Sequence, residues 1–170
     1  MPVTRPEASS AEDAPQRLEG HAAFAEALPA LMADARRRLR VLSFDLDPRL
    51  YGGAGVYKHC KDFLLLSRHS RLQILLHDTR RASQGHRLVD LGRRLSSFVE
   101  FRVLPEIEDA QVSDWVIIDE SHLLTRQRPE ALESRLWMNA PQRARQFGRD
   151  FDDLWTQSEP ALEFRTIGLG

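Results

Sequence analysis

The chain has 170 residues, of which 42% are hydrophobic, and a formal net charge of −1. This length is sufficient for one globular domain with a sizeable core, and no apolar run reaches the length of a membrane span. The near-neutral charge provides no overall attraction to nucleic acid or to an anionic membrane. The single cysteine, Cys60, excludes an internal disulfide and favours a reducing compartment. We therefore predict a globular cytoplasmic protein.

The N-terminal segment differs in composition from the rest of the chain. Residues 1–17 are rich in Pro, Ala, Ser and acidic residues and contain few apolar side chains. Such a segment buries too little apolar surface to offset the entropy lost on ordering. We therefore predict a disordered tail over residues 1–17 and a single domain over residues 18–170.

Hydrophobic periodicity and turn residues define the expected elements of the domain. The predicted helices are 21–38, 48–51, 56–67 and 86–95, with a further helix that Asn139 caps and Pro141 begins. The predicted strands are 39–44, 72–76, 98–104, 114–118, 122–125, 136–138 and 162–169. This alternation of strands and helices predicts an α/β sandwich.

The most informative stretch runs from Asp114 to His122, as Asp-Trp-Val-Ile-Ile-Asp-Glu-Ser-His. Its short, β-branched centre indicates a fully buried strand, with Asp119 at the carboxyl end, where open α/β sheets place their ligands. The letters from Asp119 to His122 also match the acidic box of helicases. That chemistry needs a Gly-x-x-x-x-Gly-Lys phosphate loop, which the sequence lacks, so we set this interpretation aside.

Three carboxylates form a candidate metal site. Asp45, Asp78 and Asp119 each follow a predicted strand, and carboxylates that meet at strand ends hold divalent cations for phosphoryl chemistry. Aspartate is also common at strand ends for purely structural reasons. The hypothesis therefore requires the three strand ends to lie side by side.

Histidines and arginines give weaker signals. His77, His86 and His122 follow predicted loops or strand ends, but no pair has the spacing of metal ligands on a helix. Arginines cluster at 36–40, 80–81, 93–94 and 143–149. These clusters would bind nucleic acid only if they shared one face of the fold, so we do not expect nucleic acid as the main partner.

From Leu39 to Leu169 the chain resembles the phospholipase D-like domain, in particular short bacterial members of unknown function. The resemblance rests on the segments Ser43–Tyr51 (SFDLDPRLY), Leu72–Asp78 (LQILLHD), Phe98–Val103 (FVEFRV), Trp115–Asp119 (WVIID), Leu136–Asn139 (LWMN), Phe147–Trp155 (FGRDFDDLW) and Leu162–Ile167 (LEFRTI). It implies a phospholipase D-like α/β sandwich, with a mixed, mostly parallel central sheet flanked by helices.

The catalytic signature of that family is His-x-Lys-x-x-x-x-Asp. If Asp119 matches its Asp, then Val112 stands in the His position and Asp114 in the Lys position. Valine can neither attack phosphorus nor donate a proton, and a carboxylate repels the phosphate that the lysine would hold. The resemblance thus implies a remnant cleft without the catalytic groups, lined by Asp45, Asp114, Asp119, His122 and Asn139.

We therefore expect a non-catalytic phospholipase D-like domain that acts as a ligand-binding or regulatory interaction module. The alternatives are a metal-assisted phosphoesterase that uses Asp45, Asp78 and Asp119, and nucleic-acid binding through the arginine clusters. We expect no cofactor, and an unidentified small ligand or protein as partner. Active family members pair two half-sites, so the resemblance also implies a homodimer.

Overall fold

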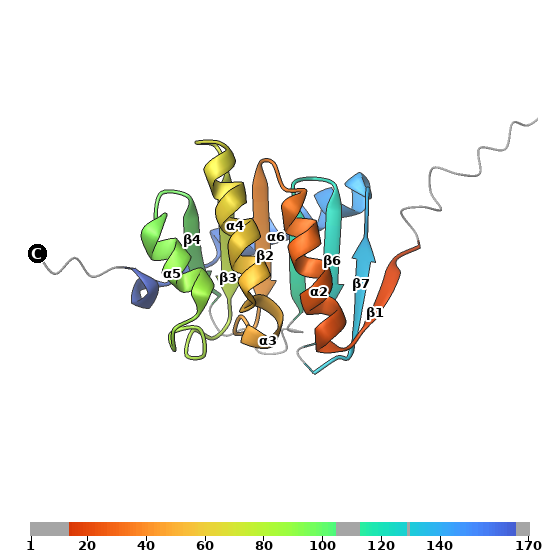
Figure 1. Ribbon diagram of the computed structural model, residues 1–170, viewed down its shortest axis with the longest axis horizontal. Coiled ribbons are helices and arrows are strands. Elements are labelled where there is room, and N and C mark those ends of the chain that lie inside the picture. Colours follow the sequence, from red (N-terminus) through yellow and green to blue (C-terminus); the bar gives the residue numbers. More distant parts are fainter. Residues whose placement is uncertain (1–13, 105–112, 129, 166–170) are drawn as a thin grey trace, which may run out of the picture.

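The computed structural model describes residues 14–104, 113–128 and 130–165, which form an eight-stranded sheet in the order β1-β7-β6-β5-β2-β3-β4-β8 (Figure 1). The strands are β1 Gln16–Glu19, β2 Arg38–Ser43, β3 Arg71–Leu76, β4 Val99–Val103, β5 Asp114–Ile118, β6 His122–Arg126, β7 Glu133–Trp137 and β8 Glu159–Pro160. Residues 1–13 of the predicted disordered tail lie outside the described residues, and β1 begins two residues before the predicted start of the domain.

The direction of the strands corrects one expectation. Only β2, β3 and β4 run parallel to one another, and the other pairings of the described strands are antiparallel. The sheet is therefore mixed but mostly antiparallel. For the pairings of β6 with β5 and β7 the reason is local, since these strands are joined by short connections, which can only reverse the chain.

Helices cover both faces of the sheet, which confirms the α/β sandwich. They are α2 Gly20–Ala33, α3 Pro48–Tyr51, α4 Ala54–Leu66, α5 Arg87–Arg94 and α6 Pro141–Thr156, with a 3-10 turn, η1, at Leu162–Phe164. Helices α2, α4 and α5 lie on one face and α6 on the other (Figure 1). In the described parts of the chain, no helix combines the length and the apolar character needed to cross a membrane.

Two hydrophobic cores follow from the alternation of side chains along the strands. In β2, Leu39 and Val41 belong to the core beneath α2, α4 and α5, whereas Leu42 belongs to the core beneath α6. Arg40 is an exception on the α6 face, where it is 3% exposed. Its guanidinium fits against Gly148 of α6, because a Cβ at that position would lie 2.6 Å from Arg40 Nη1.

Three local expectations are wrong. Helix α2 ends at Ala33, so the arginine run does not form its last turn, and Arg38 already begins β2. The N-cap of α6 is Ala140, and Asn139 has a positive φ of 51°. Of the predicted strand 162–169, Leu162–Phe164 form η1, and residues 166–169 lie outside the described residues. The expected cap of α3 is confirmed, because the Asp47 carboxylate accepts a hydrogen bond from the Arg49 N–H.

Candidate functional site

The five predicted cleft residues do not lie together. Because β5 is antiparallel to β2, with Ile118 opposite Leu39 and Trp115 opposite Leu42, the end of β5 lies beside the start of β2. Asp119 therefore lies at the opposite end of the sheet from Asp45, which follows the end of β2. The structure separates the predicted cleft into two groups, with Asp45 and Asp114 at one end and Asp119, His122 and Asn139 at the other.

Asp119 holds the connection between α2 and β2. Its Oδ1 accepts hydrogen bonds from the N–H groups of Arg37 at 2.8 Å and Arg38 at 2.9 Å, and its Oδ2 accepts one from Arg36 N–H at 3.1 Å. The proposed metal site of Asp45, Asp78 and Asp119 is therefore wrong, because the third carboxylate lies at the far end of the sheet. No group of three or more His, Cys, Asp or Glu side chains within the described ranges is arranged to hold a metal ion.

His122 and Asn139 form a second local contact at that end. Nδ1 of His122 accepts a hydrogen bond from the Asn139 N–H at 3.0 Å, and Nε2 lies 3.7 Å from Asp34 Oδ2. The next N–H, of Ala140, donates to the Ser121 carbonyl at 2.7 Å. These contacts join the β5–β6 turn to the start of α6, so both residues have a structural role here.

At the other end, where the parallel strands terminate, lies a small cleft of about 300 Å³. It is lined by Ser43, Phe44, Asp45, Asp47, Arg49, Arg81, Asp114, Arg126 and Glu130. We call these residues the small cleft. It contains Asp114, whereas Val112 lies outside the described residues.

Asp114 is buried in a network of hydrogen bonds. Its Oδ2 accepts from Arg126 Nη2 at 2.8 Å and Nε at 3.0 Å, and its Oδ1 accepts from the Tyr51 hydroxyl at 2.9 Å. The side chains of Arg126 and Asp114 are only 4% and 2% exposed. Burial, together with the charge of Asp114, raises the pKa of Tyr51 well above its ordinary value, so the phenol stays protonated and donates.

The outer acids of the small cleft are also paired with arginines. Burial alone would raise the pKa of Asp47, but hydrogen bonds from Arg49 and the charge of Arg81 outweigh it and lower that pKa. The pKa of Asp45 is raised by burial, which its ion pair with Arg81 at 3.5 Å only partly offsets. The cleft is thus filled by paired charges of both signs rather than by free cations.

Sequence reasoning missed these arginines. Arg126 stands opposite Asp114 in the β5–β6 hairpin, a pairing that the hairpin register could have indicated. Arg81 belongs to one of the predicted arginine clusters, but its contact with Asp45 and Asp47 depends on the tertiary fold.

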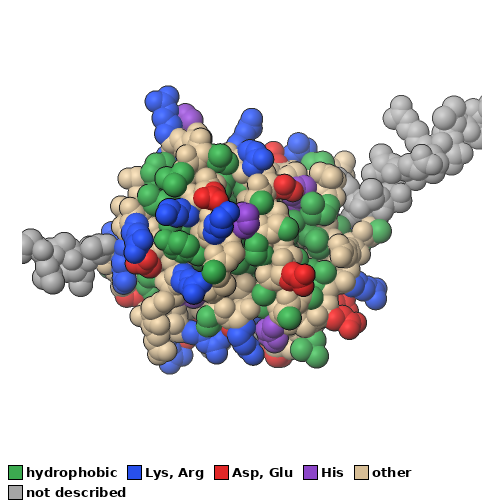
Figure 2. All heavy atoms as spheres, viewed as in Figure 1, with side chains coloured by type: hydrophobic (Ala, Val, Ile, Leu, Met, Phe, Trp, Pro, Cys, Tyr) green, Lys and Arg blue, Asp and Glu red, His purple; other side chains and the backbone are tan. Residues whose placement is uncertain are grey.

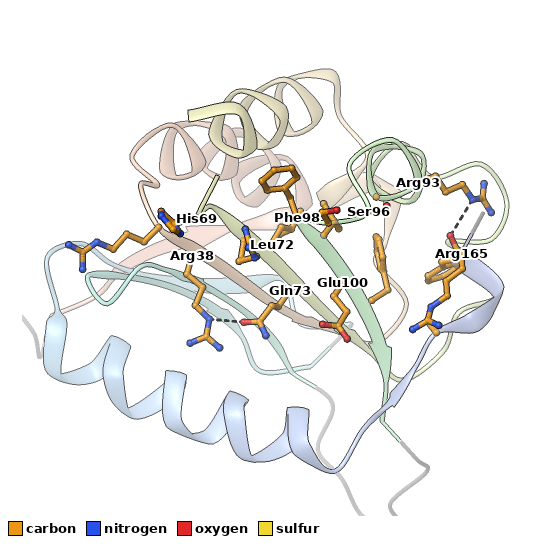
Figure 3. Close-up of a pocket in the computed structure, with 17 residues that line it drawn as sticks. Arg38, His69, Leu72, Gln73, Arg93, Ser96, Phe98, Glu100 and Arg165 are labelled. Atoms are coloured by element: carbon orange, nitrogen blue, oxygen red, sulfur yellow. Dashed lines mark hydrogen bonds between the residues drawn. The ribbon is translucent and has the colours of Figure 1, made fainter. Parts of the chain in front are cut away.

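A larger groove of about 790 Å³ lies at the opposite end, where β3 and β4 begin (Figure 3). It is lined by Arg37, Arg38, His69, Arg71, Leu72, Gln73, Gly92, Arg93, Ser96, Ser97, Phe98, Val99, Glu100, Phe101, Ala161, Phe164 and Arg165. We call it the arginine groove. It brings together parts of two predicted clusters, 36–40 and 93–94, with two arginines that the sequence analysis did not single out. The clusters 80–81 and 143–149 do not line it.

Ring stacking, helix capping and burial account for three further titratable side chains. His77 stacks on Phe44, with ring centroids 6.2 Å apart. His86 caps α5 through Nδ1, and burial lowers its pKa to about 4. Cys60 is buried, which raises the pKa of its thiol to about 12 and leaves it protonated.

Comparison with solved structures shows where this fold occurs. Nuc from Salmonella typhimurium, a phospholipase D family member, has 14% identity and a TM-score of 0.61, over 86% of this chain and 98% of Nuc. NucT from Helicobacter pylori has 9% identity and a TM-score of 0.59, also over 86% of this chain and 98% of NucT. TrmBL2, an archaeal chromatin protein with a novel mode of DNA binding, has 14% identity and a TM-score of 0.63, over 85% of this chain and 53% of TrmBL2.

At these identities the likeness concerns the fold alone, and it confirms the resemblance to phospholipase D family structures. No curated protein matches the chain. The model of one family, described as a domain of unknown function (DUF7931), matches residues 20–167. The chain therefore belongs to the DUF7931 family.

Proposed function

We propose that this chain is a binding module built on the phospholipase D fold, without phosphodiesterase activity. The observation that supports this most strongly is the buried Asp114–Arg126 pair. It occupies the place where the resemblance implies a phosphate-binding lysine. The same resemblance places Val112 in the position of the signature histidine, and valine can act neither as nucleophile nor as proton donor.

The energetics of the pair argue against a phosphate ligand at Asp114. Arg126 could hold a phosphate only after releasing Asp114, and that would leave an unpaired carboxylate with a side chain 2% exposed. Separating a buried pair in this way costs about 3–5 kcal/mol. A substrate would have to supply this free energy in addition to its own desolvation.

Hydrolysis assays test the proposal directly. The purified protein is incubated with bis(p-nitrophenyl) phosphate and with single- and double-stranded DNA, with Mg²⁺, with Mn²⁺ and with EDTA. We expect no product above the protein-free reaction in any condition. Hydrolytic activity that co-purifies with the protein and is lost in the Asp114→Asn variant would overturn the proposal. Circular dichroism of the variant checks that the fold is retained.

The same assays address a metal-assisted phosphoesterase. Without Asp119, that alternative would rest on Asp45 and its neighbours Asp47 and Asp78 at the ends of β2 and β3. Arginine partners compete with a metal for these carboxylates, because Arg81 pairs with Asp45 and Asp47, and Arg80 pairs with Asp78 at 2.6 Å. Metal-dependent turnover that disappears in Asp45→Asn would establish the enzyme.

We also propose a homodimer, because the resemblance implies that two copies of the domain pair, and a monomer mass at micromolar concentration in light scattering would contradict it. Nucleic acid is kept as a candidate ligand, because a DNA-binding chromatin protein has this fold and because the arginine groove is strongly basic.

A further inference from the structure

The arginine groove carries a local excess of positive charge. Its cationic lining consists of Arg37, Arg38, Arg71, Arg93 and Arg165, with the titratable His69, and its one carboxylate is that of Glu100. Glu100 is itself paired with Arg102 at 3.4 Å. Since the whole chain has a net charge of −1, this excess is a property of the groove and not of the protein as a whole. Figure 2 shows basic side chains over the half of the visible face where α4 and α5 lie.

Part of this lining is already ordered. Nε of Arg38 donates to Gln73 Oε1 at 2.6 Å, and its Nη2 pairs with Asp152 at 2.6 Å. The guanidinium of Arg71 lies over the Phe98 ring, 5.4 Å from its centroid. Arginines held in this way lose less side-chain entropy when they bind an anion.

Two arginines are free to bind. Arg37 and Arg165 are exposed, and the side chain of neither has an ion pair or hydrogen bond with another part of the described chain. Figure 3 shows that Arg38, which follows Arg37, and Arg165 lie at opposite ends of the groove. An anion that binds Arg37 and Arg165 would not have to displace an internal ion pair, so its binding free energy is not reduced by that cost.

The span of the cations indicates a ligand with several negative groups. Arg38 lies on β2, whereas Arg93 lies in the last turn of α5, which packs on β4, and β3 separates β2 from β4. Neighbouring strands are about 4.8 Å apart, so the backbones of β2 and β4 are about 10 Å apart. One phosphate group cannot contact both ends. The groove volume of about 790 Å³ is that of a ligand pocket, which can hold a short stretch of an extended single strand but not the full width of a duplex.

We propose that the arginine groove binds the phosphate backbone of single-stranded nucleic acid. The groove lies at the opposite end of the sheet from the small cleft, so this inference does not depend on whether the small cleft is inactive. Exposed Ser96 and Ser97 and the amide of Gln73 supply hydrogen-bond donors for phosphate or base edges. Arg71 and Phe98 present a stacked cationic and aromatic pair beside them.

Fluorescence anisotropy with a labelled single-stranded oligonucleotide, in EDTA, tests the proposal. Contacts with about four phosphates predict a slope of about −3 for the logarithm of affinity against that of salt, or about a 50-fold loss between 50 and 200 mM KCl. The test variant is Arg37→Glu/Arg165→Glu. The matched control is Arg17→Glu/Arg128→Glu, which changes the charge equally at exposed arginines outside the groove.

The test variant is expected to bind at least tenfold more weakly and to have a salt slope less steep by about 1.4, as two lost phosphate contacts require. The control is expected to lose less than threefold. An equal loss in both doubles would overturn the proposal, as would undetectable binding at low salt. Equal affinity for a duplex would overturn the assignment to single strands. So would displacement of the oligonucleotide by AMP or inorganic phosphate at a concentration equal to that of the oligonucleotide.

Discussion

The buried pair of Asp114 and Arg126 allows a quantitative test of how the small cleft is closed. The two side chains are 2% and 4% exposed and form two hydrogen bonds, of 2.8 and 3.0 Å. Replacement of one partner leaves the other charge buried. The expected cost is about 3–5 kcal/mol for Arg126→Met, and about 1 kcal/mol more for Asp114→Leu, because the Tyr51 hydroxyl then loses its acceptor as well.

The double variant Asp114→Leu/Arg126→Met should behave differently from the sum of its parts. Replacement of a buried ion pair by hydrophobic side chains is close to neutral, so we expect a cost of about 1 kcal/mol, whereas the two single costs add up to about 9 kcal/mol. Urea denaturation followed by circular dichroism measures each free energy of unfolding. Arg128→Met, an exposed arginine of the same region, is the control and should change stability by less than about 0.5 kcal/mol.

Two results would refute this reasoning. A cost below about 1 kcal/mol for Arg126→Met would mean that water or another group readily takes its place, and that the small cleft is open to ligands. Additive costs in the double variant would mean that Asp114 and Arg126 contribute independently, so that their pairing is not what closes the cleft.

Two other substitutions test the packing and the electrostatics. Gly148→Ala should destabilise the protein by about 1–3 kcal/mol in the same urea assay, because the new Cβ lies 2.6 Å from the buried Arg40 guanidinium, and a neutral effect would contradict the fit of α6 on β2. The pKa of His86 is about 4 in the fold, below its ordinary 6.5. The neutral imidazole therefore makes its full contribution to the free energy of unfolding above pH 6.5. This contribution, about 3 kcal/mol in total, is lost as the pH falls through 4. His86→Asn retains an acceptor for the Leu88 N–H but does not titrate, so it should lose less stability between pH 7 and 4.5, and an unchanged pH dependence would show that His86 is not responsible.

Much of the fold could be predicted from local patterns. The apolar runs of β2, β3 and β5 were identified to within one residue, and the Asp47-Pro48 pair correctly marked the start of α3. These features depend on neighbouring residues alone. The predicted end of α2 was wrong because a run of arginines is compatible with a helix. The observed connection is favoured by the hydrogen bonds that three successive N–H groups donate to the Asp119 carboxylate.

The candidate site could not be predicted in the same way. Residues that follow strands meet at one edge of the sheet only if the strands are parallel, and β5 is antiparallel to β2. The antiparallel direction of β5 places Asp119 at the other end of the sheet, where it cannot share a metal ion with Asp45 and Asp78. One partner of Asp114, Tyr51, was missed because it lies 63 residues away in the sequence, and a pairing over that distance leaves no local signal. The other, Arg126, stands opposite Asp114 in the β5–β6 hairpin and could have been found from its register.

The two ends of the sheet differ in how their charges are satisfied, and this difference decides where a ligand can bind. In the small cleft, Asp114, Asp47 and Asp45 have arginine partners within the fold, so a ligand must first displace an internal ion pair. In the arginine groove, Arg37 and Arg165 have no such partners among the described residues, so an anionic ligand loses only the hydration of the exposed side chains. A phosphate-bearing ligand is therefore expected in the arginine groove, at the end of the sheet opposite the small cleft.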